Sequence, residues 1–234
     1  MVNPETARTA VGIIGNVISV GLFMSPVPTF LRIIKKKDVE NFKPDPYIAT
    51  LLNCFLWVFY GMPFVHPHSM LVQTINGFGI FIEAIYISIF FIYSNWPKRR
   101  KILLWLLGEA VMFVAIVLST LLAVHGTKKR TIIAGTFCVI LNVIMYASPL
   151  TVMRMVIKTK SVKYMPFWLS VANLANGLTW MCYALIRIDP WVAVPNGLGA
   201  FFGILQLILY GVYYKTTNWD EEEKPKEVEI PGKP

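Results

Sequence analysis

Seven apolar runs divide the chain, and each is long enough to cross a lipid bilayer as a helix. A membrane-spanning helix needs about 20 predominantly apolar residues, and short basic or polar segments separate the runs. The chain is 56% hydrophobic and only 15% charged, whereas soluble domains carry about 25% charged residues. The pattern predicts an all-α membrane protein with helices over residues 9–34, 46–64, 70–93, 102–124, 132–157, 166–186 and 191–214.

Three pairs of motifs recur at a nearly constant spacing. The first predicted helix holds Ser25-Pro26 and the fifth Ser148-Pro149. The second and sixth share Asn, Trp and Tyr at i, i+4 and i+7, and the third and seventh share Asn-Gly. Because four helices separate the copies, an even number, both copies have the same orientation. The sequence therefore predicts two parallel three-helix repeats joined by a linker helix (3+1+3). The predicted units are 9–93, the linker 102–124, 132–214 and a disordered cytosolic tail, 215–234.

Most of the 22 basic residues lie in the loops after the first, third and fifth predicted helices and in the tail. Basic loops face the cytosol, so the N-terminus is predicted to be extracellular or luminal and the C-terminus cytosolic. The net charge of +9 does not indicate nucleic-acid binding, because these residues sit in short loops between spans. A plasma-membrane and a vacuolar-membrane location both fit this pattern.

Four asparagines are predicted near the middle of the membrane. An amide in hydrocarbon needs partners, and it offers both a donor and an acceptor, as sugar hydroxyls do. Trp57 and Trp180 share helical faces with two of these amides and could stack on a sugar ring. The competing interpretations are helix–helix hydrogen bonding for the amides and ordinary packing for the indoles. The symmetry of the set favours a shared polar cavity formed by Asn53, Asn76, Asn176 and Asn196.

Prolines and outer-end residues are candidates for moving parts. Pro26 and Pro149 lie inside helices and are expected to kink them, while two further prolines, Pro46 and Pro166, open the second helix of each repeat. They are interpreted either as hinges or as tolerated transmembrane prolines. At the outer end of the bundle, a tyrosine–aspartate hydrogen bond between the repeats would close the cavity on that side. The alternative is that these polar residues are ordinary solvated loop residues. The residues concerned are Tyr60, Tyr183 and Asp189.

Other chemistry-bearing residues give weaker signals. Glu83 lies seven residues after Asn76, on nearly the same face, and is interpreted as a proton site or a structural acid. The three cysteines read as small core residues, although Cys54, beside Asn53, is kept among the substrate-binding candidates. The sequence holds no phosphate-binding loop, zinc motif, nucleophile elbow or paired carboxylates, so neither an enzyme nor a metal site nor a cofactor is predicted.

The helix pattern and four stretches of sequence closely resemble plant SWEET sugar transporters, the MtN3/saliva, PQ-loop-related group. They are the 3+1+3 pattern with residues 25–30, 148–150, 161–167 and 194–199, and the resemblance spans residues 11–214. It implies that Asn76 and Asn196 bind sugar, that Trp57 and Trp180 are aromatic walls and that the four prolines flex together. The positions implied to tune pocket size are Leu22, Asn53, Met145 and Asn176. The implied inner gate is Phe42, Tyr164 and Met165, and the implied outer gate is Tyr60 with Asp189.

The resemblance and the residues together predict a bidirectional, low-affinity sugar uniporter that works by alternating access. Bulky residues at the tuning positions favour a monosaccharide such as glucose over a disaccharide, and the resemblance also implies a homo-oligomer in the bilayer. Two alternatives are a proton-coupled sugar carrier that uses Glu83 and a non-transporting seven-helix receptor or scaffold.

Overall fold

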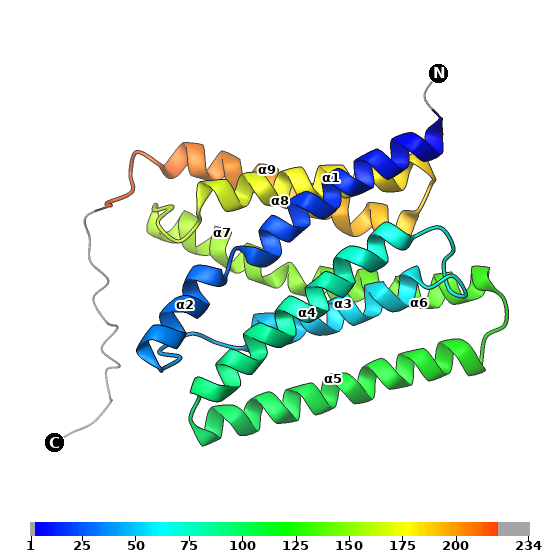
Figure 1. Cartoon of the computed structure of the whole chain (residues 1–234). Coiled ribbons are helices and arrows are strands. Elements are labelled where there is room, and N and C mark those ends of the chain that lie inside the picture. The colour runs from blue at the N-terminus through cyan, green and yellow to red at the C-terminus, as the bar shows by residue number, and fades with distance from the viewer. Residues whose placement is uncertain (1–2, 220–234) are drawn as a thin grey trace.

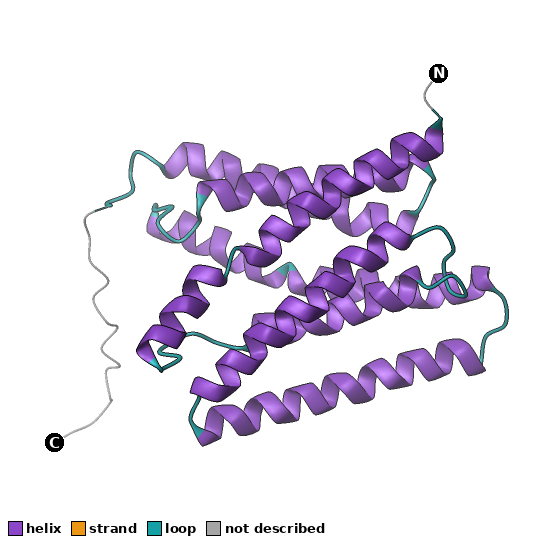
Figure 2. Ribbon diagram, in the orientation of Figure 1, coloured by secondary structure: helices purple, strands orange, loops and turns teal. Residues whose placement is uncertain are grey.

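The computed structural model describes residues 3–219, which are almost entirely helical. Figure 1 shows the helices as a bundle whose long axes run in similar directions, and Figure 2 shows short loops between them. Two predicted spans are each split into two segments, α1 with α2 and α6 with α7, so the described chain crosses the bundle seven times. The segments are α1 (Pro4–Met24), α2 (Val27–Lys36), α3 (Asp45–Gly61), α4 (Met70–Tyr93), α5 (Trp96–Leu122), α6 (Thr127–Met145), α7 (Ala147–Thr159), α8 (Phe167–Ile186) and α9 (Pro190–Tyr213).

The two interruptions fall where the interior prolines were expected to bend the first and fifth spans. Proline has no N–H, and its ring clashes with the carbonyl four residues back. In the first span α1 ends at Met24 and Pro26 caps α2. In the fifth span α6 ends at Met145, which is the residue four before Pro149, and α7 resumes at Ala147. Both repeats therefore contain a broken helix at matching positions.

The outer surface of the bundle is that of a membrane protein. Six helical stretches within residues 3–219 are long and apolar enough to cross a bilayer. The seventh, α3, has 17 residues, the lower end of the range for a span. In α5 only Ile102, Ile116 and Thr120 are buried, while Leu107 and Val111 are more than 60% exposed. Apolar side chains exposed along a whole helix are stable in lipid, and the protein is an integral membrane protein.

The helices pack as two equivalent bundles. In the first, α1 and α3 both contact α4, and in the second, α6 and α8 both contact α9. Between the bundles, α1 packs on α8 and α3 on α6, and a twofold rotation exchanges these two interfaces. The linker α5 lies outside, against α3, α4 and α6 (Figure 1). The predicted fold class, two parallel three-helix repeats with a linker, is confirmed.

The two ends of the bundle differ in charge. We call the end that holds the N-terminus and the α3–α4, α5–α6 and α8–α9 loops the N-terminal face, and the opposite end the basic face (Figure 1). At the basic face, Glu40 pairs with Arg32 and Lys36, and Asp45 pairs with Lys101. The Glu40 pairs hold the α2–α3 loop against α2, and the Asp45–Lys101 pair joins the start of α3 to α5.

The first residues of the predicted tail pack against the basic face. Thr217 is buried, and its hydroxyl accepts a hydrogen bond of 2.9 Å from the amide of Val162. The rest of the predicted tail, residues 220–234, lies outside the described residues.

Candidate functional site

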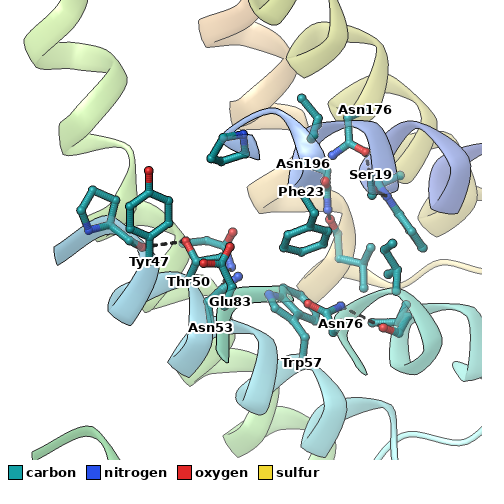
Figure 3. Close-up of a pocket in the computed structure, with 18 residues that line it drawn as sticks. Ser19, Phe23, Tyr47, Thr50, Asn53, Trp57, Asn76, Glu83, Asn176 and Asn196 are labelled. Atoms are coloured by element: carbon teal, nitrogen blue, oxygen red, sulfur yellow. Dashed lines mark hydrogen bonds between the residues drawn. The ribbon is translucent and has the colours of Figure 1, made fainter. Parts of the chain in front are cut away.

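A cavity of about 370 Å³ lies between the two repeats. This volume is at the lower end of the range for small-molecule pockets. It is lined by matching residues from both halves of the chain. Figure 3 shows the side chains of the four asparagines and of Trp57 among those that line the cavity. The matching residues are Asn53, Trp57, Val72 and Asn76 from the first repeat and Asn176, Trp180, Val192 and Asn196 from the second.

Asn76 and Asn196 are held in the same way in the two repeats. Each donates one amide hydrogen to the carbonyl four residues earlier, Asn76 to Val72 at 2.8 Å and Asn196 to Val192 at 2.8 Å. An asparagine amide has two donors and an acceptor oxygen, so each side chain keeps a donor and its oxygen for the cavity. The amides are therefore fixed in orientation before a ligand arrives, which lowers the entropic cost of binding.

The two indoles form opposite walls and are held by edge-on aromatic contacts. Trp57 meets Tyr60 with ring centroids 5.3 Å apart, and Trp180 meets Tyr183 at 5.2 Å. Both indoles are more than 90% buried. Flat apolar faces beside amide groups suit a neutral ligand that carries both hydroxyls and an apolar ring face.

Two hydrogen bonds join the repeats across the cavity. The Ser19 hydroxyl donates to the Asn176 oxygen at 2.6 Å, and the Asn142 amide donates to the Asn53 oxygen at 2.9 Å. The twofold rotation exchanges the two bonds, because Ser19 and Asn142 are the same 123 residues apart as Asn53 and Asn176. Ser19 also accepts from the Trp180 indole N–H at 3.1 Å. Sequence analysis missed Ser19 and Asn142, although a search for polar residues at this spacing would find them.

A hydrogen-bond network seals the cavity at the N-terminal face. Tyr60 donates to Asp189 at 2.7 Å, and a ring nitrogen of His66 lies 3.2 Å from the other carboxylate oxygen. The His66 ring also stacks on Tyr60, with centroids 4.7 Å apart. Tyr60 and Asp189 are at most 3% exposed. This contact joins α3 of the first repeat to the start of α9 in the second.

Arg8 provides the second half of the seal. Its guanidinium lies 4.1 Å from the centroid of the Tyr183 ring and donates to the His68 carbonyl at 2.8 Å. Arg8 is only 4% exposed, so its charge is held by the ring face and by a backbone dipole. Arg8 and His66 were not predicted as gate residues, because nothing in their sequence context separates them from ordinary loop residues.

The Asp189 carboxyl stays ionised within this seal. Burial acts to raise its pKa, but the hydrogen bonds from His66 and Tyr60 outweigh burial and hold the pKa below its ordinary value. A group whose pKa is lowered by folding contributes its stabilisation above the unfolded-state pKa, about 3.9 for aspartate. That stabilisation is lost only as the pH falls through the lower folded-state pKa. The Asp189 carboxyl therefore remains ionised throughout the range from pH 5 to 8.

Towards the basic face the cavity remains open. It extends to Pro26 and Pro46, at the starts of α2 and α3. The three predicted inner-gate residues lie apart: Phe42 packs on a first-repeat core cluster, Met165 is buried with Val156 and Val162, and Tyr164 is 48% exposed. None of the three lines the cavity.

The other predicted site residues divide between the cavity lining and the surrounding core. Leu22 lines the cavity, but Met145 and Cys54 do not. Cys54 is 1% exposed, and its sulfur occupies the space beside Gly79, where a β-carbon would lie 2.6 Å from it. The inclusion of Met145 and Cys54 among the ligand contacts is therefore corrected. Of the four prolines, Pro26 and Pro46 line the cavity and Pro149 and Pro166 do not.

The lining mixes polar and apolar side chains and is almost uncharged. Glu83 is its one titratable acid, and it contains no Lys, Arg or His. No group of three His, Cys, Asp or Glu side chains within residues 3–219 could hold a metal ion. A membrane-embedded chamber between two parallel repeats, closed at one end and open at the other, defines a membrane transport protein for a small neutral polar solute.

Known proteins identify the family. The chain matches the family described as "Sugar efflux transporter for intercellular exchange" over residues 9–98 and 133–218. It is 55% identical to the bidirectional sugar transporter SWEET5 of Arabidopsis thaliana over 227 residues, 97% of this chain and 95% of the relative. It is also 55% identical to SWEET7b of Oryza sativa subsp. indica over 231 residues, 99% of this chain and 86% of the relative.

A solved structure has the same fold. The structure of a eukaryotic SWEET transporter, determined at 3.7 Å resolution, superposes with a TM-score of 0.86 at 34% sequence identity, covering 91% of this chain and 99% of the other. The chain belongs to the SWEET family of sugar transporters, as its motifs predicted, and these relatives are transporters rather than enzymes.

Proposed function

We propose that this chain is a bidirectional, low-affinity uniporter that moves a monosaccharide, glucose before others, by alternating access. The observation that carries the proposal is the cavity itself, which is lined symmetrically by two amides and two indoles, sealed at one face and open at the other. The named relatives are bidirectional sugar transporters, which supports the same direction-independent transport here.

In this mechanism the structure is the conformation open to the basic face. A sugar enters there, places its ring between Trp57 and Trp180, and exchanges water for the free amide groups of Asn76 and Asn196. Release at the other face requires the Tyr60–Asp189 contact to break. It also requires the inner-gate residues Phe42, Tyr164 and Met165 to come together. The helix breaks near Pro26 and Pro149, with Pro46 and Pro166, are the proposed flexing points.

The monosaccharide preference rests on how the middle of the chamber is filled. Asn53 and Asn176 are larger than serine or alanine, and their amide oxygens are tied across the repeats by Asn142 and Ser19. Fixed side chains cannot turn aside for a bulkier ligand. Together with Leu22 they take up space in the part of the chamber where a second ring would have to pass.

We further propose that the basic face is cytosolic, in a plasma or vacuolar membrane, and that the chain assembles as a homo-oligomer. The first proposal follows from the concentration of Lys and Arg at that face, and the second from the family resemblance. The structural units are proposed to be residues 9–93 and 132–214 with the linker 102–124, and the two matched family segments agree with this division.

Purified protein in proteoliposomes should equilibrate radiolabelled glucose and should not concentrate it. We expect the final internal glucose concentration to equal the external one, whether or not a pH gradient of two units is imposed, because no carboxylate pair or ion site accompanies the sugar. Sucrose should cross at least about tenfold more slowly than glucose. The measurement is the uptake time course and its plateau.

Two results would contradict this account. Accumulation above the external concentration under an inward proton gradient, lost in Glu83→Gln, would establish proton coupling. Absence of any protein-dependent flux, with well-folded protein and several sugars, would favour the receptor or scaffold alternative.

A further inference from the structure

The cavity continues beyond the four asparagines and two indoles towards the basic face, where most of its lining residues come from the first repeat. We call this end of the cavity the antechamber. Figure 3 shows Tyr47, Thr50 and Glu83 grouped together on the side away from Asn176 and Asn196. The first repeat contributes Phe23, Pro26, Pro46, Tyr47, Thr50 and Glu83 to this end of the cavity. Asn53 lies beside Thr50 and Glu83 and accepts a hydrogen bond from Asn142 of the second repeat (Figure 3).

Glu83 lines the antechamber, and the proposed binding of a sugar by the asparagines and indoles gives it no role. It is only 4% exposed, and its Oε2 atom is buried without a hydrogen-bond partner among the described residues. A buried polar atom without a partner is costly, and an acid inside a membrane protein that faces a cavity marks a functional position. The carboxyl group is therefore placed to bind something that enters the cavity.

The fold does not require an acid at this position. In the second repeat the matching residue is Gly203, and a β-carbon there would lie 2.9–3.2 Å from atoms of Leu174. The helices α8 and α9 thus close together at the level where α3 and α4 enclose a carboxyl group. The second repeat therefore packs at this level without a side chain, so the acid in the first repeat is not a feature that the repeated fold requires.

The position of Glu83 fits a second ring rather than the first. Glu83 lies seven residues after Asn76 on α4, about 10 Å along the helix axis at 1.5 Å per residue, so its backbone is two turns nearer the basic face than that of Asn76. Aromatic side chains flank it, Phe23 and Tyr47, and the Thr50 hydroxyl adds an acceptor while donating to the Pro46 carbonyl at 2.8 Å. This combination of an acid, a hydroxyl and aromatic faces is suited to the hydroxyls and apolar faces of a sugar.

We propose that the antechamber is a second hexose subsite in which Glu83 binds ring hydroxyls. A disaccharide then binds from the basic face with one ring between the indoles and the other beside Glu83, even where its transport is slow. The inference rests on the proposed sugar-binding chamber. It adds that Glu83, on the side of the chamber towards the basic face, contributes to disaccharide binding.

The test is competition binding to purified wild-type protein, using radiolabelled glucose as the tracer and unlabelled glucose or maltose as the competitor. Maltose is chosen because its first ring is glucose. We expect Glu83→Ala to raise the half-inhibitory concentration of maltose about tenfold, the effect of losing one hydrogen bond to an acid. The value for glucose should stay within about twofold. Glu83→Gln keeps a donor and an acceptor and should restore most maltose binding.

A matched control is Glu109→Ala, since Glu109 is another acid within a membrane helix and does not line the cavity. Glu109→Ala should change the half-inhibitory concentration of neither glucose nor maltose. The proposal is overturned if Glu83→Ala weakens glucose and maltose equally, if it weakens neither, or if wild-type protein binds maltose no better than Glu83→Ala does. Failure of the proposed function is a different result, namely no displaceable glucose binding to wild-type protein.

Discussion

Asn76→Ala and Asn196→Ala are each expected to reduce glucose flux by roughly 5- to 150-fold. Each change removes a cavity amide whose orientation is fixed by a bond to Val72 or Val192. Losing a hydrogen-bond partner in a buried site costs about 1–3 kcal/mol, which corresponds to this range of rates. The measurement is radiolabelled glucose uptake in cells that lack their own hexose carriers, corrected for the amount of protein at the surface.

Asn173→Ala is the matched control for these variants. Asn173 lies on α8, is exposed and does not line the cavity, so its replacement should leave flux within about twofold of wild type. Normal flux in a well-expressed Asn76→Ala or Asn196→Ala protein would remove that residue from the sugar site.

Tyr60→Phe is expected to open the N-terminal face. The change removes the hydroxyl that donates to Asp189 at 2.7 Å but keeps the ring that stacks on His66. A hydrogen bond to a charged group contributes about 1.5–3 kcal/mol, so the ratio of sealed to open conformations should fall roughly 10- to 100-fold. A cysteine at Val72, which lines the deep cavity, should then react faster with a membrane-impermeant maleimide applied from that face. The assay uses a background in which the three native cysteines are replaced by alanine.

The matched control for Tyr60→Phe is the same substitution at the equivalent tyrosine of the second repeat. Tyr183 is the matching residue of the second repeat, and it contributes its ring face to Arg8 rather than a hydroxyl to a partner. Tyr183→Phe keeps that ring and should change the labelling rate by less than about twofold. Equal effects of the two variants would show that the seal depends on general packing and not on the Tyr60–Asp189 bond.

The fold was predictable because its signals are local and repeated. Apolar runs of spanning length, basic loops on alternate sides and motif spacings of 120 to 123 residues are all present in the linear sequence. The predicted third helix, residues 70–93, has the bounds observed for α4. The helix breaks near Pro26 and Pro149 follow from the missing N–H of proline.

The cavity was predictable only in part, because its lining depends on how helices face one another. Asn76, Asn196 and the two indoles were found from symmetry and spacing. Cys54 was misplaced because its sulfur turns towards Gly79 on α4 rather than into the cavity. Arg8 and His66 were missed because their partners lie on other elements, and no periodic pattern in the sequence records a contact between residues far apart in the chain.

The asymmetric features were the hardest to predict. Symmetry pairs Glu83 with Gly203, so the motif comparison marks Glu83 as an exception without giving it a role. The structure places the carboxyl in the extension of the cavity towards the basic face. Residues that break the repeat symmetry, such as Glu83, can therefore make the cavity differ between its end at the basic face and its end at the N-terminal face.

The most direct test of the account is a structure determined with glucose bound. We predict that the ring lies between Trp57 and Trp180, with hydroxyls within hydrogen-bonding distance of both Asn76 and Asn196. Glucose bound elsewhere, or a chamber in which those two amides are filled by protein groups and exclude the sugar, would contradict the account.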